Sequence, residues 1–436
     1  MRGTRENGSW RLVPAKVAFL PMKLGCLAPF DGSDRNALRP PGPVCQGICL
    51  VVLGTLTAAA ADRWDWSDQV PAVTWHAEIG AGFSSVAVAD NRVYAFGNAA
   101  DEDLISCLDA ASGRVVWVYR YPSRALGLFQ PDEPGPRATP LVLGDAVYTL
   151  SRDGRLLCLE AGEGRLRWWI DVPAEIGERP PHWGFGGSPL PWGDLLIWPV
   201  GAHGLAIRAD TGKVVWKSAP VPSAVWSTQP VGVSGYATPE PIEFRGRRLV
   251  SIGNENRWQI VDPASGTVEW STPWEVPYGV NSAQPAIVRG LVVLSGGYGY
   301  GTRVVRVGDD AGPLWENKHL RSHFSNLAVV DDHLYGVDGN QQDGARCELR
   351  CLHLETGEIR WAQERFGFAN LVLADKRLLL LTARGELVLV LPDPAGYRER
   401  GRVQILPGET WTAPVVAGNS IYARNKQGRL VRVDLQ

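Results

Sequence analysis

The sequence has little charge of one sign and few segments with the apolar spacing of helices. Its 436 residues carry 44 Lys and Arg against 46 Asp and Glu, a formal net charge of −2, so no basic surface of the kind that binds nucleic acid is expected. The scarcity of helical periodicity excludes helical bundles and helical solenoids. Instead, 49 Gly and 32 Pro separate short apolar runs in the manner of strands and tight turns. The composition therefore predicts an all-β protein.

Several enzyme motifs are also missing. The sequence has no glycine-rich dinucleotide motif between a strand and a helix, no phosphate-binding loop and no Gly-x-Ser-x-Gly elbow. The Gly-rich stretch SGGYGYG at 295–301 lies between two apolar runs and predicts a hairpin. GNENRW at 253–258 is a compact acid and amide cluster that suggests calcium, but a polar turn between strands is the simpler interpretation.

The seven cysteines include no adjacent pair. Three lie near the N-terminus, and three others occupy one position in different copies of the repeat described below, where we expect small buried side chains. The pattern CELRCLH at 347–353 places two cysteines four residues apart on a predicted strand, and a separation of about 13 Å is too long for a shared metal ion. We therefore predict neither disulfides nor a metal site. The three near the N-terminus are Cys26, Cys45 and Cys49, and the three at the repeated position are Cys107, Cys158 and Cys351. The seventh is Cys347.

An apolar run near the N-terminus resembles a secretory signal. Residues 44–61, VCQGICLVVLGTLTAAAA, follow Arg35 and Arg39 and end in small residues, so we expect cleavage near Ala60 or Ala61. A retained anchor helix is the alternative, although the run is short for a membrane span. We therefore divide the chain into an N-terminal extension with the signal (1–61) and a mature domain (62–436). The mature protein is expected in the periplasm or outside the cell, with no stable membrane span.

The domain is built from a repeat, best seen in the stretch 138–168, ATPLVLGDAVYTLSRDGRLLCLEAGEGRLRW. Four short apolar runs separated by Gly-containing turns predict four antiparallel strands. Aligned on the closing tryptophan, the copies end at positions roughly 45–54 residues apart, and four strands within such a period are typical of propeller blades. These tryptophans are Trp117, Trp168, Trp216, Trp270, Trp315 and Trp361.

Two further copies lack the closing tryptophan and bring the number of units to eight. The first begins at Asn370, and the second, beginning at Ala413, stops after three strands. The segment AVTWHAEIG around Trp75 precedes the first full unit and supplies the missing strand. We therefore predict an eight-bladed β-propeller of four-stranded antiparallel blades, closed by an N-terminal strand, which leaves no exposed sheet edge. The expected inner-strand starts are Ser85, Thr139, Ser188, Thr238, Gln284, Asn326, Asn370 and Ala413.

The ends of the repeats, DAASGRVVW, ADTGKVVW and DPASGTVEW, resemble the tryptophan-docking motif of the pyrroloquinoline-quinone-like (PQQ-like) propeller repeat. That repeat occurs in the quinoprotein alcohol dehydrogenases and in the propeller lipoprotein of the outer-membrane barrel assembly machinery. The resemblance covers residues 70–436 and implies that each indole docks between neighbouring blades. The docking set comprises Trp75, Trp117, Trp168, Trp216, Trp270, Trp315 and Trp361, which we expect to be structural.

The same resemblance bears on function. The catalytic members are longer, hold the quinone beside two adjacent cysteines and bind calcium. This sequence has no adjacent cysteines and no convincing set of calcium ligands. We therefore expect a non-enzymatic, monomeric scaffold without a cofactor, which binds a protein partner or a small polar ligand. A PQQ-dependent dehydrogenase with calcium and an atypical pocket is the alternative, followed by another enzyme of the channel mouth, such as a hydrolase or lyase.

The candidate ligand site follows from propeller geometry, since the loops that lead into the innermost strands converge at one mouth of the central channel. The segment PPHWGFGG at 180–187 is the strongest candidate, because a His beside two aromatics in a Pro/Gly frame exceeds what a connection requires. On this view His182→Ala and Trp183→Ala leave the melting temperature nearly unchanged. The alternative is that many of these side chains plug the channel and bond to backbone groups. The candidate residues are Arg137, His182, Trp183, Phe185, Tyr236, Asn281, His323, Asn326, Asn370 and Trp411.

Overall fold

The structure is a computed structural model that describes residues 64, 66, 70–123, 135–308 and 312–435. The N-terminal extension and the secretory signal expected at 1–61 lie outside these residues, as do Cys26, Cys45 and Cys49. Within the described ranges, no helix has both the length and the apolar character needed to cross a bilayer.

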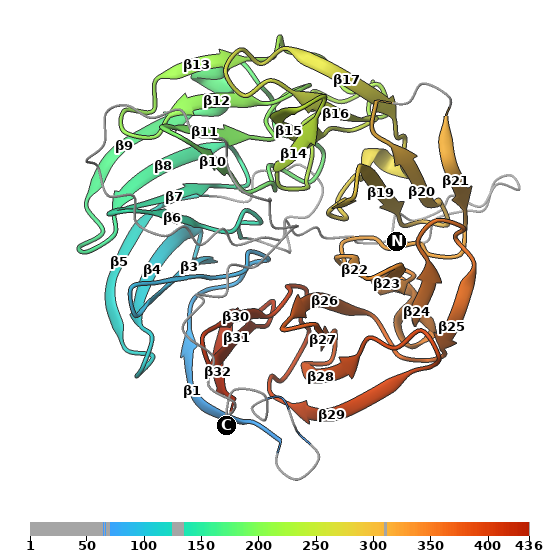
Figure 1. Cartoon of the computed structure of the whole chain (residues 1–436). Coiled ribbons are helices and arrows are strands. Elements are labelled where there is room, and N and C mark those ends of the chain that lie inside the picture. The colour runs from blue at the N-terminus through green and yellow to red at the C-terminus, as the bar shows by residue number, and fades with distance from the viewer. Residues whose placement is uncertain (1–63, 65, 67–69, 124–134, 309–311, 436) are drawn as a thin grey trace, which may run out of the picture.

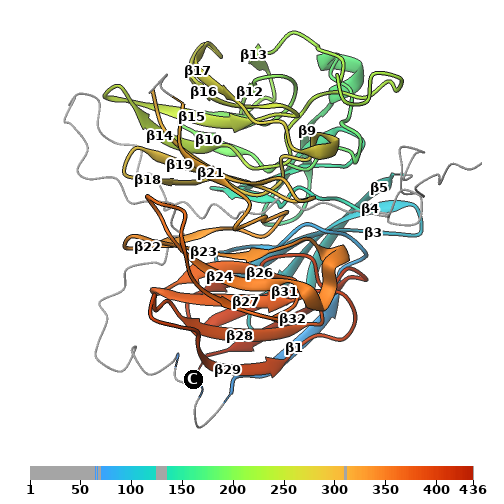
Figure 2. The ribbon, with the colours of Figure 1, turned by 90° about the vertical axis from the view of Figure 1, so that its right-hand side faces the viewer.

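Eight four-stranded antiparallel sheets form a ring around a central axis (Figure 1). Figure 2 shows the same ring from the side. Blades 1 to 4 are β2 (Ala87–Ala89), β3 (Arg92–Ala99), β4 (Glu102–Asp109) and β5 (Val115–Pro122); β6 (Leu141–Leu143), β7 (Ala146–Leu150), β8 (Arg155–Glu160) and β9 (Leu166–Asp171); β10 (Leu190–Trp192), β11 (Leu195–Trp198), β12 (Leu205–Arg208) and β13 (Val214–Lys217); β14 (Glu240–Phe244), β15 (Arg247–Gly253), β16 (Arg257–Val261) and β17 (Val268–Pro273).

The second half of the ring repeats this arrangement. Blades 5 to 8 are β18 (Ala286–Val288), β19 (Leu291–Gly296), β20 (Gly301–Arg306) and β21 (Pro313–Asn317); β22 (Ala328–Val330), β23 (His333–Asp338), β24 (Glu348–His353) and β25 (Ile359–Gln363); β26 (Ala369–Ala374), β27 (Arg377–Thr382), β28 (Glu386–Leu391) and β29 (Arg398–Gln404); β30 (Val415–Ala417), β31 (Ser420–Arg424), β32 (Arg429–Asp434) and β1 (Ala72–Glu78). Short helical turns between strands of the described ranges are η3 (Val172–Ile176), η4 (Pro277–Gly279) and η5 (Gln341–Arg346).

The predicted closure by an N-terminal strand is confirmed. β1 pairs antiparallel with β32, for example Glu78 with Arg429, and the two lie side by side in Figure 1. The Arg424 guanidinium, buried at the end of β31, joins blade 8 to blade 1 through hydrogen bonds to the carbonyls of Phe96 (2.8 Å) and Gly80 (2.7 Å). The eighth blade is therefore made from both ends of the described chain.

Most innermost strands begin two residues after the predicted start. In blades 1 to 3 the residues at the predicted starts use their backbone N–H groups for bonds to the next blade: Ser85 donates to Thr139 Oγ1 (3.1 Å) and Thr139 to Ser188 Oγ (2.9 Å). The same link continues from Ser188 to Thr238 Oγ1 (3.3 Å). These residues therefore link neighbouring blades and do not take part in the strand pairing within their own blade. The strands start after them for this reason.

The tryptophans of the docking set end most blades against the turn of the next one. Trp216 Nε1 donates to the Pro263 carbonyl at 2.8 Å, and its ring lies on Gly266, where an added Cβ would be 2.6 Å from the indole. Gly266 also has φ of 75°, a region that favours glycine. The corresponding Nε1 donors and carbonyl acceptors are Trp75 to Ala110, Trp117 to Ala161, Trp168 to Ala209, Trp315 to Leu354 and Trp361 to Asp393. Trp270 packs edge-on against Trp258.

Blade 7 fills its docking position with a tryptophan from outside the blade. Opposite Leu389, where the pairing of β28 and β29 shifts register, stands Gly401, in the place that Trp216 takes opposite Ala206 in blade 3. Trp66 covers this glycine, with its Cβ 2.6 Å from where a Cβ of residue 401 would lie. Trp64, also buried, donates from Nε1 to Asp375 at 2.8 Å. Residues just before β1 thus complete the seam between blades 7 and 8, a role that the sequence did not indicate.

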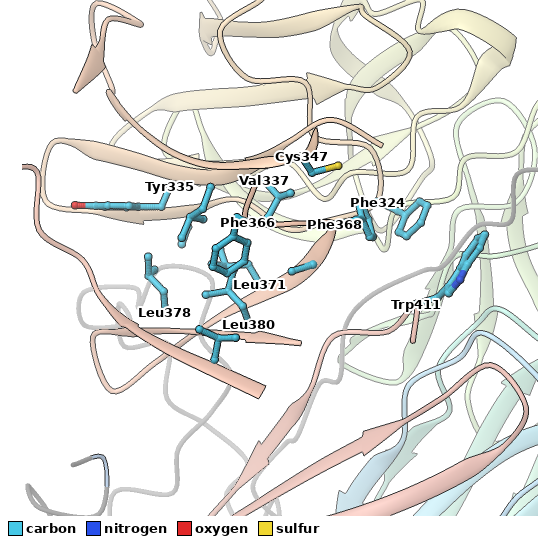
Figure 3. Close-up of a cluster of buried hydrophobic side chains, with 14 of the residues drawn as sticks. Phe324, Tyr335, Val337, Cys347, Phe366, Phe368, Leu371, Leu378, Leu380 and Trp411 are labelled. Atoms are coloured by element: carbon cyan, nitrogen blue, oxygen red, sulfur yellow. The ribbon is translucent and has the colours of Figure 1, made fainter. Parts of the chain in front are cut away.

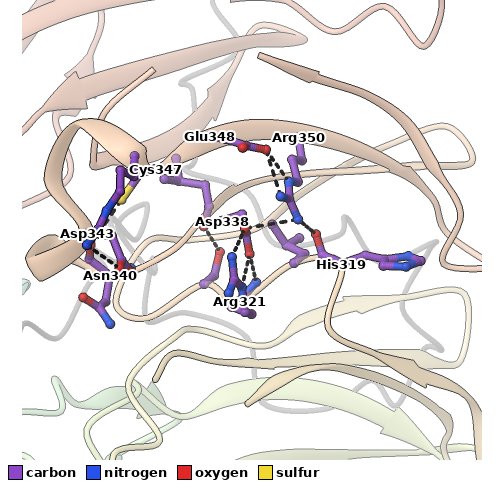
Figure 4. Close-up of polar contacts among 12 residues, drawn as sticks. His319, Arg321, Asp338, Asn340, Asp343, Cys347, Glu348 and Arg350 are labelled. Carbon is purple, nitrogen blue, oxygen red and sulfur yellow. Dashed lines mark hydrogen bonds and ion pairs between the residues drawn. The ribbon is translucent and has the colours of Figure 1, made fainter. Parts of the chain in front are cut away.

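The described cysteines are buried thiols, as expected for three of them from their repeated position. Cys107, Cys158 and Cys351 each pair across the sheet with a docking tryptophan, and burial raises the pKa of each to about 11. Cys347 donates from Sγ to the Asn340 carbonyl at 3.1 Å (Figure 4). These environments keep the thiols protonated at neutral pH.

The polar groups around Cys347 pair with one another on blade 6. The buried Asp338 carboxylate accepts from Arg321 Nε at 2.8 Å and lies 3.1 Å from Arg350 Nη1, while Glu348 pairs with Arg350 (Figure 4). Asn340 and Asp343 form a capping box on η5. The network holds the connection between β23 and β24.

Candidate binding site at the channel mouth

The ten predicted site residues are all buried, with at most 9% of each residue exposed. Their loops do converge, since Trp183, Tyr236 and Trp411 belong to one cluster of buried apolar side chains. His182 and Trp183 come from a loop, but both side chains lie in the interior. The effect of His182→Ala and Trp183→Ala on the melting temperature stays a prediction. That these ten residues bind a ligand stays a prediction.

An aromatic plug of Phe83, Phe324, Phe368 and Trp411 fills the inner end of this cluster. Phe324 stacks on Trp411 with ring centroids 5.3 Å apart, and Phe83 meets the same indole edge-on at 5.4 Å. Phe324 also contacts Phe368 at 4.8 Å. Figure 3 shows Phe324, Phe368 and Trp411 at one end of the cluster, with Tyr335 and Leu378 at the other. Loops of blades 1, 6, 7 and 8 thus close this part of the channel with side chains.

The other predicted residues have separate positions. Arg137 lies with its guanidinium carbon 4.9 Å from the centre of the Phe83 ring. Phe185 belongs to the core between blades 2 and 3 and not to the cluster of Trp183. Asn281 donates to the carbonyls of Asn254 and Trp274 at 2.6 and 2.9 Å, which fits the alternative of bonding to backbone groups. Asn370 lies within β26, and Asn326 lies just before β22.

A stack of three rings, His182, Trp226 and Tyr278, covers the mouth beside blades 3 to 5. His182 lies flat against Trp226, with ring centroids 3.5 Å apart and 14° between the planes. Trp226 stacks on Tyr278 at 6.3 Å and donates from Nε1 to the Tyr278 carbonyl at 3.1 Å. The stack leads from the buried His182 to Tyr278, which is 52% exposed. We call these three residues the ring stack.

The stack continues toward the centre of the ring. Tyr278 contacts Tyr298 edge-on at 5.1 Å, and Tyr298 meets His323 at 4.7 Å. Sequence analysis named His323 but missed Trp226, Tyr278 and Tyr298. Trp226 carried one usable signal, since it is a tryptophan outside the docking motif in the long connection between β13 and β14.

A small cleft lies beneath the ring stack. Side chains nearly fill it: the space between them, about 170 Å³ with the solvent outside its opening included, leaves no room for a bound molecule. Glu255 lies in it and is 5% exposed; its carboxylate accepts from Ser223 Oγ and from the N–H groups of Ala224 (3.1 Å) and Val225 (3.3 Å). The lining residues are Pro181, His182, Trp226, Gly232, Ser234, Tyr236, Glu255, Tyr278 and Gly279.

The GNENRW segment forms a turn that presents Glu255 to this cleft. Asn254 Oδ1 accepts from the N–H groups of Asn256 (3.0 Å) and Arg257 (2.8 Å), and Asn254 Nδ2 donates to the Ala202 carbonyl at 2.7 Å. The amide of Asn254 is therefore occupied in shaping the turn, in line with the simpler interpretation of this cluster.

Burial makes the two predicted histidines poor bases. It lowers the pKa of His182 from 6.5 to about 4 and that of His323 to about 3, because desolvation disfavours the imidazolium. Both rings are therefore neutral at neutral pH and serve as aromatic surfaces.

This produces a pH dependence of stability. Below about pH 6.5 the unfolded chain binds a proton at residue 182 that the folded protein resists, so stability is complete above pH 6.5 and falls toward pH 4. At about 1.4 kcal/mol per pKa unit, His182 accounts for up to roughly 3 kcal/mol. Urea unfolding of His182→Gln should show a shallower loss in this window than the parent. His76→Gln, at an exposed position on β1, should match the parent, and equal slopes for His182→Gln and parent would contradict the effect.

The residues present do not fit the quinone and calcium site that the family resemblance raises. The described cysteines are buried and provide no adjacent pair, and among the described residues no three His, Cys, Asp or Glu side chains gather as a ligand set. The aromatic plug occupies the channel centre, and the cleft beneath the ring stack is small.

Comparisons with known proteins point to two groups. The dehydrogenase subunit of alcohol dehydrogenase (quinone) from Gluconacetobacter polyoxogenes is 31% identical over 147 residues, which cover 31% of this chain and only 19% of that protein. Among solved structures, BamB from Moraxella catarrhalis has a TM-score of 0.58 at 16% identity, covering 84% of this chain and 98% of that one. A europium-containing methanol dehydrogenase has a TM-score of 0.60 at 12% identity, covering 81% and 84%.

At such identities the solved structures show the fold alone. A family model described as outer membrane protein assembly factor BamB matches residues 130–363, more than half of the 436 residues. The chain therefore belongs to this family of PQQ-like propellers.

Proposed function

We propose that the protein is an exported, non-enzymatic propeller that binds a segment of a partner protein at the channel mouth. The observation that carries the proposal is the ring stack, which ends in the exposed Tyr278. The connection between β13 and β14 that holds Trp226 also carries Val221 and Val225, each 46% exposed. Exposed apolar and aromatic side chains around a polar cleft are typical of protein-binding surfaces. The similarity to BamB along 98% of that chain supports a scaffold of this size.

A cross-linking experiment tests the proposal. A photoreactive amino acid at Val225, beside the ring stack, should give a specific cross-linked protein in the native host. The matched control is the same amino acid at Ile359, which is 41% exposed. It lies on β25, the outer strand of blade 6, and not in a loop of the channel mouth. Identical products from both positions, or none from Val225, would contradict a partner site at the mouth. Cell fractionation and light scattering test the expected export and monomeric state.

The dehydrogenase similarity favours a second candidate, a PQQ-dependent oxidoreductase with an atypical pocket. It requires substrate-dependent reduction of an artificial electron acceptor that appears only with added quinone and calcium. Such activity, abolished by Trp411→Ala but retained in Val225→Ser, would replace the scaffold proposal. We expect no such activity, because the aromatic plug fills the channel centre.

A further inference from the structure

Two histidines of blade 6 face each other across neighbouring strands. The register of β23 and β24 pairs His333 with His353. The Leu354 N–H donates to the Asp332 carbonyl at 2.8 Å, and the N–H of His353 itself donates to the Glu358 carbonyl at 2.8 Å. The two histidines are therefore a non-hydrogen-bonded pair, the kind in which opposite side chains lie closest together. Their ring centroids are 5.6 Å apart, with 89° between the planes.

This separation suits two imidazoles that share one metal ion. A ring nitrogen binds Zn²⁺ at about 2.0–2.1 Å, so two rings at a tetrahedral angle have centroids about 5 Å apart. The pair lies close to that value before any side-chain rotation. Imidazole is a good ligand for zinc, copper and nickel, whereas Ca²⁺ and Mg²⁺ prefer oxygen ligands. The geometry therefore favours a divalent transition metal.

The ring nitrogens are in a state that accepts a metal. His353 Nδ1 is shielded from solvent, and no hydrogen-bond partner reaches it among the described residues. Such an atom costs free energy, and a metal bond would offset that cost. Burial, with smaller effects of His353 and Arg360, lowers the pKa of His333 below 6.5. The His333 ring is therefore neutral at neutral pH, as a metal ligand must be.

The turn before the pair is acidic. Asp331 and Asp332 stand between β22 and His333. Asp332 lies within electrostatic range of both rings, because they add to the hydrogen bond from Arg289 in holding the pKa of its carboxyl below the usual range. Arg289 Nη1 donates to this carboxylate at 2.8 Å. The two carboxylates attract a cation to the pair.

We propose that His333 and His353 together bind one divalent transition-metal ion such as Zn²⁺. Among the described residues no third His, Cys, Asp or Glu completes a ligand set, so water fills the other positions and the affinity is expected in the micromolar range. The innermost strand β22 runs from the channel mouth to the turn at 331–332. The site therefore lies at the end of blade 6 away from the mouth, and it does not depend on the proposed function.

Calorimetric titration of the full chain with ZnCl₂ at neutral pH tests the site. His333→Gln and His353→Gln should each weaken Zn²⁺ binding at least about tenfold, since metal affinity depends on the number of ligands. The double variant should bind little more weakly than either single variant, because one imidazole alone does not hold the ion. His76→Gln, at an exposed position of β1, is the matched control and should keep the parent's affinity.

NMR of the histidine rings gives a second measurement that needs only the parent protein to fold. The chain has 7 histidines, and Zn²⁺ should shift the ring signals of two of them together, while MgCl₂ shifts neither. Zn²⁺ bound by cysteines elsewhere in the chain would leave these two signals in place. Equal Zn²⁺ affinity in the parent and both single variants, no binding, or no shifted pair of ring signals overturns the site.

Discussion

Replacing Trp216 with alanine should lower the free energy of unfolding by about 3–5 kcal/mol, the usual cost of truncating a buried tryptophan. The indole is buried between blades 3 and 4, donates to the Pro263 carbonyl and lies on Gly266. Truncation removes these contacts, leaves a carbonyl without its donor and opens a cavity against a turn that cannot collapse. Urea unfolding of the parent and the variant measures the change.

Trp169→Ala is the control for this experiment. Trp169 follows a docking tryptophan on β9 but is 48% exposed, where it contacts Arg155. Its removal should cost less than about 1 kcal/mol, since it contributes only exposed area and a surface cation–π contact. If Trp216→Ala and Trp169→Ala had equal effects, the indole of Trp216 would not have the docking role that its geometry indicates.

Trp66→Ala should be nearly as damaging, at about 3 kcal/mol, although this residue lies outside every blade. It packs on Gly401 and completes the core between blades 7 and 8. Gly401→Trp should also destabilise the protein, because its Cβ would collide with Trp66. Since the closest contact is with the Cβ of Trp66, which alanine would keep, the double variant uses Trp66→Gly, and the new indole then occupies the space that Trp66 leaves.

The double variant makes the prediction specific. Trp66→Gly with Gly401→Trp should be more stable than the sum of the effects of Trp66→Gly and Gly401→Trp by at least about 1 kcal/mol, since residues in contact are coupled. Denaturant unfolding of the three variants and the parent gives this coupling. Additive effects would show that Trp66 does not stand in for a docking tryptophan.

The blades could be predicted from the sequence because their information is local. Six copies hold a Gly turn and a closing tryptophan three or four residues apart, so residues such as Gly266 and Trp216 can be recognised in the printed sequence. The closing role of β1 followed from counting strands. In contrast, Trp66 follows closely on a run that resembles a cleaved signal, and its partner Gly401 is far away in the sequence.

The candidate site could be predicted only in part. Propeller geometry brings the inner loops together, and it did place Trp183, Tyr236 and Trp411 in one cluster. Whether such side chains line a channel or fill it depends on their summed volume, and Phe83 and Phe324 complete the plug. The ring stack depends on Trp226 and Tyr278, which lie in connections without counterparts in the other blades, so no repeat pattern marked them.

Blade 8 takes strands from both ends of the described chain, and this affects the order in which the ring folds. Blades 1 to 7 form from neighbouring strands, but Thr74 and Arg432, which meet in blade 8, are 358 positions apart. Contacts of such separation form late, because the entropy of closing the loop must be overcome first. Until then β32 presents an unpaired edge, so the seam of β1, β32 and Trp66 is the last part of the ring to form and the first at which it opens.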